Sequence, residues 1–93
     1  MKPRKTKELD AILKKKGFIT YKRDHTFYIL CDGNRKTSIF TKLSHGMKEY
    51  SKDLLAQMAR QLSLSNKEFE QLLNCPINHD KLIKLLKEKN KIN

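Results

Sequence analysis

Histidines are the side chains of this sequence best suited to acid–base chemistry near neutral pH, and there are three: His25, His45 and His79. An imidazole titrates close to neutrality, so one ring can accept a proton or donate one. His25 follows the charged residues 22–24 and opens an apolar run, where the end of a predicted strand presents a side chain to solvent. We therefore expect His25 to act as an acid or base, with Lys22 and Arg23 holding a phosphate.

RNA cleavage is the reaction that needs least beyond these groups. RNA contains its own nucleophile, the 2′-hydroxyl, so an enzyme has only to remove that proton, stabilise charge on the phosphate and protonate the leaving oxygen. Each histidine also has a plainer interpretation, as a solvated strand end (His25), a loop residue (His45) or a surface residue (His79). Because the histidines form no HExxH motif or His–carboxylate cluster, we predict no metal and no cofactor.

Composition favours a polyanionic partner. The chain has 93 residues, with 21 Lys and Arg against 10 Asp and Glu, giving a formal net charge of +11. Such a surplus attracts polyanions through steering and counterion release, which makes nucleic acid the first partner class and an acidic protein the second. No apolar run is long enough to span a membrane, and the first ten residues lack the apolar stretch of a signal peptide. We expect a cytoplasmic protein with no membrane partner.

The length predicts a single domain over residues 1–93, because half of so short a chain would bury too little apolar area. Its two cysteines, Cys31 and Cys75, have no CxxC pairing or nearby histidine spacing, which favours reduced structural thiols over a disulfide or a zinc site. Residues 1–5 form a basic arm whose tip we expect to be mobile. A helix is predicted over 6–16, with Thr6 as its cap and Gly17 as its stop.

The elements that must position the histidines begin with three strands. Aromatic and β-branched residues predict strands at 18–22, 26–31 and 37–43, and their short connections allow only an antiparallel meander. Residues 42–49 are predicted to be a loop. Apolar residues at helical spacing, with Ser and Asn caps, predict helices at 51–62, 65–73 and 78–89.

This order predicts an α+β fold of α-β-β-β-α type, with both helices on one face of a three-stranded antiparallel sheet. The core would span about residues 6–62, and a helical extension about residues 65–90. The topology and the basic surplus both match a double-stranded-RNA-binding-like domain. They support a class of partner and not an activity.

Several segments in this order resemble the HicA-type toxins of prokaryotic toxin–antitoxin pairs. They are Gly17-Phe18 after a Lys-rich helix, then HTFYIL, GNRKTSIFTKLSHG and LLAQMARQLSLSNKEFEQLL, and the resemblance covers about residues 5 to 75. It implies a double-stranded-RNA-binding-like fold, cleavage of mRNA without a metal cofactor, a histidine as the active group, and inhibition by a cognate antitoxin protein. The expected activity is that of an endoribonuclease, an mRNA interferase.

The resemblance places the family's strand-two histidine on His25, as the catalytic residue. In the family a Gly-Ser pair usually precedes this histidine after a longer hairpin, whereas Arg23 and Asp24 stand here. The family's His-Gly after strand three resembles His45-Gly46, which we expect near the RNA-binding face. The predicted RNA-binding residues are Lys22, Arg23, Lys42 and His45.

Two alternatives from other classes fit the same sequence. The first is a non-catalytic RNA- or DNA-binding module, in which residues 51–62 and 65–73 would form a helix-turn-helix. The segment that would read DNA, NKEFEQLL, carries two glutamates and one lysine, which repels phosphate. The second is a protein-interaction partner only, whose basic face docks an acidic inhibitor or scaffold.

Overall fold

The computed structural model describes residues 1–74 and 76–92, so the prediction for Cys75 lies outside the described residues. The elements in chain order are β1 (Arg4–Lys5), α1 (Thr6–Lys15), β2 (Phe18–Lys22), β3 (His25–Asp32), β4 (Arg35–Ser44), β5 (Glu49–Tyr50), α2 (Lys52–Gln61), α3 (Asn66–Leu73) and α4 (His79–Glu88). The strands β2, β3 and β4 form a three-stranded antiparallel sheet in that order. The predicted α+β class with an α-β-β-β-α order is confirmed.

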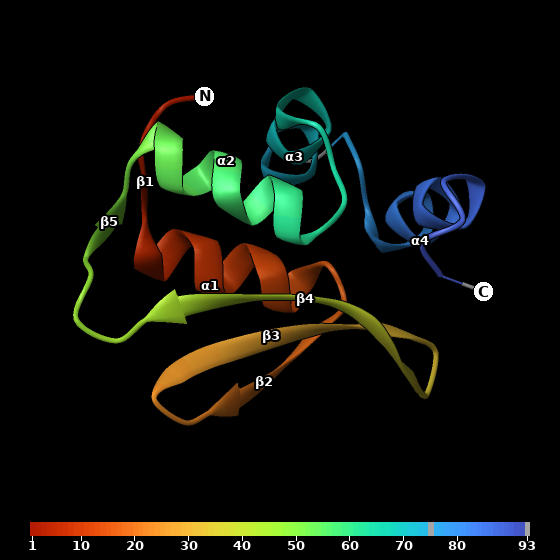
Figure 1. The fold of residues 1–93 in the computed structure, drawn as a ribbon, viewed down its shortest axis with the longest axis horizontal. Coiled ribbons are helices and arrows are strands. Elements are labelled where there is room, and N and C mark those ends of the chain that lie inside the picture. The colour runs from red at the N-terminus through yellow and green to blue at the C-terminus, as the bar shows by residue number, and fades with distance from the viewer. Residues whose placement is uncertain (75, 93) are drawn as a thin grey trace.

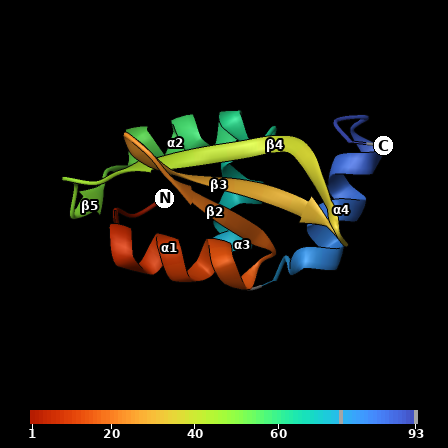
Figure 2. The same cartoon turned by 90° about the horizontal axis from the view of Figure 1, so that it is seen from below.

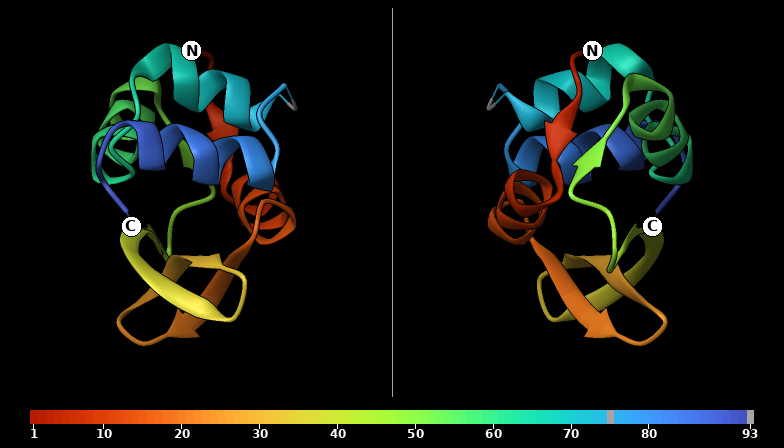
Figure 3. Two further views of the ribbon diagram at one scale, coloured as in Figure 1. Left: turned by 90° about the vertical axis from the view of Figure 1, so that its right-hand side faces the viewer. Right: turned by 90° about the vertical axis from the view of Figure 1, so that its left-hand side faces the viewer.

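The two faces of this sheet differ in what covers them. Along β3, Tyr28 and Leu30 are buried, while Phe27 and Ile29, which alternate with them, are half-buried. This alternation follows from the pleat, which sends successive side chains to opposite faces. All the helices lie on one side of the sheet (Figures 1 and 3). The buried Tyr28 and Leu30 face that side, since the Tyr28 hydroxyl donates to Asp10 of α1. In the described part of the chain the other side, here called the outer face, is left without a covering helix (Figure 2).

A single core joins the sheet to all four helices. The largest apolar side chains that are fully buried are Leu9, Leu13, Leu30, Leu55, Leu62, Phe69, Leu72, Leu82 and Leu86. They belong to one cluster, so the helices after residue 65 share the core of the first part of the chain. α3 lies farther from the sheet than α1, and α4 lies at the end where the β3–β4 hairpin turns (Figure 1).

The helix starts after the sheet are set by local caps, as predicted. Ser51, Ser65 and Asn78 each accept a hydrogen bond from a backbone N–H of the first turn. At Ser65 the bond is reciprocal, because the Glu68 carboxylate accepts from the backbone N–H of Ser65 in a capping box. These motifs satisfy backbone donors that a helix start otherwise leaves unpaired.

The structure adds a strand at the base of the N-terminal arm and corrects the predicted loop at residues 42–49. Arg4 and Lys5 pair with Tyr50 and Glu49 as a short antiparallel ladder, so the arm is anchored at its base. Residues 42–49 are not all loop, because β4 runs to Ser44 and β5 begins at Glu49. Thr6 does not cap α1: its hydroxyl donates to the Met47 carbonyl, and Lys5 stands at the cap without a side-chain bond. Contacts with the distant segment outweigh the local cap, and they fix the loop that carries His45.

His79 is half-buried and not the simple surface residue that its sequence position suggests. Its Nε2 lies 2.7 Å from the carbonyl oxygen of Cys31. The ring also lies against Gly17, where a Cβ would stand 2.2 Å from His79 Cδ2. His79 therefore joins the start of α4 to the turn after α1 and to the end of β3. Cys31 is a free, half-buried thiol.

Candidate functional site

His25 opens β3 at the end of the sheet opposite α4, where it pairs with Ser44 of β4 (Figure 1). Its place in the alternation puts it on the outer face, in line with Phe27. The ring is half-buried, so it is less exposed to solvent than its place at a strand end predicts. Nδ1 is buried without a hydrogen-bond partner, the one such side-chain atom among the described residues. An unpaired buried polar atom costs about 1–3 kcal/mol, so this nitrogen adds no stability through hydrogen bonding.

Two of the predicted phosphate-binding cations share the face of His25. The side chain of Arg23 lines a hollow on the outer face, and the Arg23 backbone N–H donates to the His25 carbonyl at 2.9 Å. Lys42 is exposed and pairs with Phe27, two residue pairs from His25 and in the next row on the same face. A polyanion on this face would meet the histidine and both cations together.

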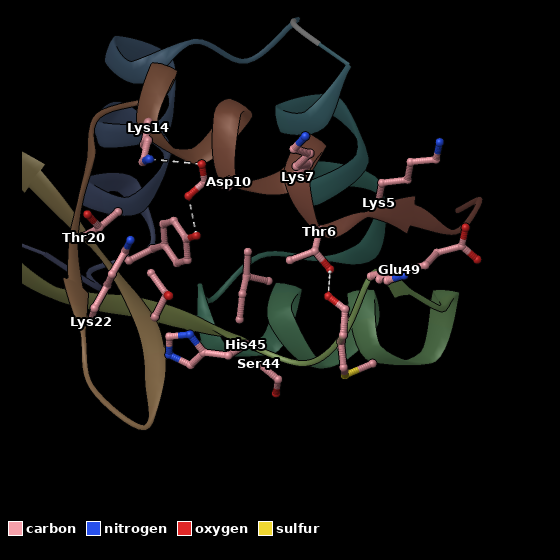
Figure 4. A pocket seen from close by; sticks show the side chains of 15 residues that line it. Lys5, Thr6, Lys7, Asp10, Lys14, Thr20, Lys22, Ser44, His45 and Glu49 are labelled. Atoms are coloured by element: carbon pink, nitrogen blue, oxygen red, sulfur yellow. Dashed lines mark hydrogen bonds and ion pairs between the residues drawn. The ribbon is translucent and has the colours of Figure 1, made fainter.

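Lys22 and His45 lie on the other side of the same sheet end. Both line a cleft of about 730 Å³ between α1 and the sheet (Figure 4). The exposed His45 ring is tethered, with Nε2 3.1 Å from the Arg23 carbonyl oxygen. The predicted residues are thus gathered at one end of the sheet but divided between its two faces.

The cleft is rich in cations but is also lined by two carboxylates that the sequence did not single out, Asp10 and Glu49. Its lining includes the lysines Lys5, Lys7, Lys14, Lys22 and Lys48. Inside it, the Tyr28 hydroxyl donates to Asp10 at 2.6 Å and Lys14 pairs with Asp10 at 3.1 Å (Figure 4). Burial acts to raise the pKa of Asp10, but the Tyr28 hydrogen bond and Lys14 outweigh it and hold that pKa below its usual range. Burial and the bond to Asp10 raise the pKa of Tyr28.

No sequence spacing connects Asp10 with Tyr28, because one lies on a helix and the other on a central strand. The signal that could have suggested the pair is the tyrosine on the buried parity of β3, whose hydroxyl needs a partner. The outer-face hollow was missed as well. Its signal was the apolar character of both parities of β3, with Phe27 and Ile29 on one and Tyr28 and Leu30 on the other.

Neither a metal cluster nor a membrane span is found within the described residues. No group of three or more His, Cys, Asp or Glu side chains is placed to hold a metal ion. None of the described helices has the length and apolarity needed to cross a bilayer. Comparison with protein families, curated proteins and solved structures gives no match to this chain.

Proposed function

We propose that this chain is a HicA-like toxin of a toxin–antitoxin pair, an endoribonuclease that cleaves mRNA without a metal ion and uses His25 as its acid–base group. The observation that carries the proposal is the setting of His25. The ring lies at the end of the sheet on the face without a helix, beside Arg23 and Lys42, and one of its nitrogens is buried without a partner.

The cleavage follows from the chemistry of RNA. His25 takes the proton of a 2′-hydroxyl as that oxygen attacks the adjacent phosphorus, and the P–O5′ bond breaks. The products are a 2′,3′-cyclic phosphate and a 5′-hydroxyl, to which a proton is returned. Arg23 and Lys42 offset the charge that develops on the phosphate oxygens. With a single imidazole on this face we expect a modest rate, which suffices for growth inhibition.

The cleft on the other face supports binding of the RNA backbone. Its lysines provide a cationic lining next to the same sheet end, and Lys22 and His45 stand at its rim beside the β2–β3 turn. A strand that rounds this turn would meet cations on both sides. The net charge of +11 also suits an acidic antitoxin, which would compete with RNA for the same surface.

The helix-turn-helix alternative is less well supported. α3, which would read DNA, has its acidic groups engaged within the protein. Glu68 is bonded to Lys89, and Glu70 lies 3.5 Å from the N-terminal ammonium of Met1. Lys67 is then the one cation of α3 that could attract phosphate.

The test is cleavage of RNA in the presence of a chelator. Wild-type protein is expected to cut RNA with excess EDTA and to leave 2′,3′-cyclic phosphate ends. The same oligonucleotide with methylated 2′-hydroxyls should be bound but left intact, because the nucleophile is blocked. Cleavage of the methylated strand, or no cleavage of either strand, would exclude the proposed chemistry.

A further inference from the structure

The outer face of the sheet carries an aromatic surface that the proposed chemistry at His25 does not use. The large apolar side chains exposed on the described part of the chain are Ile19 (38 %), Tyr21 (38 %) and Phe40 (49 %). All three have outer-face parity on β2 or β4. Tyr21 and Phe40, together with half-buried Phe27 and Ile29 of β3, line one hollow and are here called the platform. Ile19 pairs with Ile29 but does not line that hollow.

The register brings the rings of the platform together. Tyr21 pairs with Phe27 in one cross-strand row, and Ile29 pairs with Phe40 in the next. The Phe27 and Phe40 centroids are 6.3 Å apart with their planes tilted by 47°. Between the rings lies a hollow of about 490 Å³. It falls within the size range of pockets that hold small organic groups, among them nucleobases.

The cations around the platform suit phosphate. The residues that line the hollow include Arg23 and Lys36 and no carboxylate. Lys36 reaches from β4 across β3, and its Nζ lies 4.6 Å from the centroid of the Tyr21 ring. A cation directly above an aromatic ring can bind the phosphate of a nucleotide whose base contacts the neighbouring ring. A second copy of this chain would bring the same cations against them and be repelled.

We infer that the outer face binds single-stranded RNA, with bases stacked on Tyr21 and Phe40 and phosphates held by Arg23 and Lys36. The inference rests on the proposed function and names its substrate as single-stranded, since the bases of a duplex offer no free faces for stacking. Along β3, Phe27 is two residues from His25 on the same face, a separation of roughly 7 Å. A strand stacked on the platform therefore runs toward the imidazole.

The test is affinity for a strand that cannot be cut. Fluorescence anisotropy would measure binding of a single-stranded RNA of about 12 nucleotides with methylated 2′-hydroxyls. Tyr21→Leu and Phe40→Leu keep apolar bulk but remove the ring, so each should weaken binding roughly 5- to 100-fold. Ile19→Ala, the matched control, removes exposed apolar area without removing a ring and should leave affinity within about twofold. An abasic strand should bind wild type and both leucine variants equally weakly.

Wild-type affinity in both leucine variants would overturn the inference and assign the platform to an acidic protein partner. An equal loss in Ile19→Ala would also overturn it, because apolar contact without stacking would then explain the binding. Since the strand cannot be cleaved, the result is separate from that of the nuclease assay. Ring-dependent binding without any cleavage of ordinary RNA would remove the proposed enzyme and keep the single-strand platform.

Discussion

The contact between Gly17 and His79 shows how one residue fixes the position of a distant helix. Gly17 has a φ of +94°, a conformation that glycine adopts readily and other residues rarely do. Its missing side chain leaves the space in which the His79 ring lies against the turn. Gly33 also has a positive φ, of +65°, but a Cβ there would meet nothing within 4 Å. Both glycines are needed for a positive φ, but only at Gly17 would a side chain also clash with a neighbouring residue.

Replacement of these glycines should separate the two requirements. Gly33→Ala should lose about 1–2 kcal/mol of unfolding free energy from its left-handed backbone. Gly17→Ala should lose that amount plus about 1–3 kcal/mol from the clash with His79. Urea unfolding measures both variants. In a Gly17→Ala/His79→Ala double variant part of the excess should return; a fully additive loss would contradict the account of this contact.

Glu68 makes stability depend on acid pH. The hydrogen bond from Lys89, followed by the backbone N–H of Ser65, holds the pKa of Glu68 below its usual range. A lowered folded-state pKa stabilises the protein above the ordinary carboxyl value of about 4.3, and the stabilisation is lost as pH falls through the folded-state value. Glu68→Gln keeps an acceptor for the cap and removes the charge.

The expected result is a loss of about 1 kcal/mol in Glu68→Gln at neutral pH. The difference from wild type should shrink steadily as the pH is lowered below about 4. Glu88→Gln, in an exposed carboxylate near the end of α4, is the control and should show little difference at any pH. Urea unfolding at a series of pH values measures this. If the difference in unfolding free energy between Glu68→Gln and wild type became larger at acid pH, the ion pair of Glu68 with Lys89 would be refuted.

Features that depend on neighbouring residues could be predicted from the sequence, whereas contacts between distant segments could not. The place of His25 at the start of a strand followed from the charged turn and the apolar run beside it. Three features depend on contacts between segments that are many residues apart: the burial of His25 Nδ1, the Asp10–Tyr28 hydrogen bond and the position of His79. A local sequence pattern does not show which distant segments come into contact.

At the scale of elements, the strands and helices with a clear period were found, and the shortest were not. The three main strands and the four helices each repeat apolar residues often enough to define a face. β1 and β5 are two residues each and have no period to detect. Their pairing is supported by hydrogen bonds between Thr6 and the loop after β4. The N–H of Thr6 donates to the Lys48 carbonyl at 2.9 Å.

Removal of the Thr6 hydroxyl should therefore weaken this junction. Thr6→Val deletes the bond to the Met47 carbonyl and leaves that acceptor partly buried, with an expected loss of about 1 kcal/mol in unfolding free energy. Thr20→Val on β2 is the matched control and should be neutral or slightly stabilising, since valine favours strands. Urea unfolding compares the two variants. Equal stability would show that the hydroxyl does not anchor the loop.

At the scale of the whole molecule, the positive charge at one end of the sheet should govern RNA binding. Each phosphate contact by a lysine contributes about −0.7 to the slope of log affinity against log salt for a single strand. Lys22→Ala should reduce the magnitude of that slope by about this amount. Lys67→Ala removes an exposed lysine from α3, away from the sheet, and should not change it. Equal slopes for the two variants would mean that the cleft does not contact phosphate.

The most direct measurement is the single-turnover rate of RNA cleavage by His25→Ala in EDTA at saturating protein. We expect a fall of about 100-fold or more, the usual contribution of a general acid or base, with RNA affinity and stability close to wild type. The buried Nδ1 has no partner to lose, so truncation should not unfold the chain. His45→Ala should keep most of the rate. Cleavage at the wild-type rate in His25→Ala would contradict the assignment of the active group.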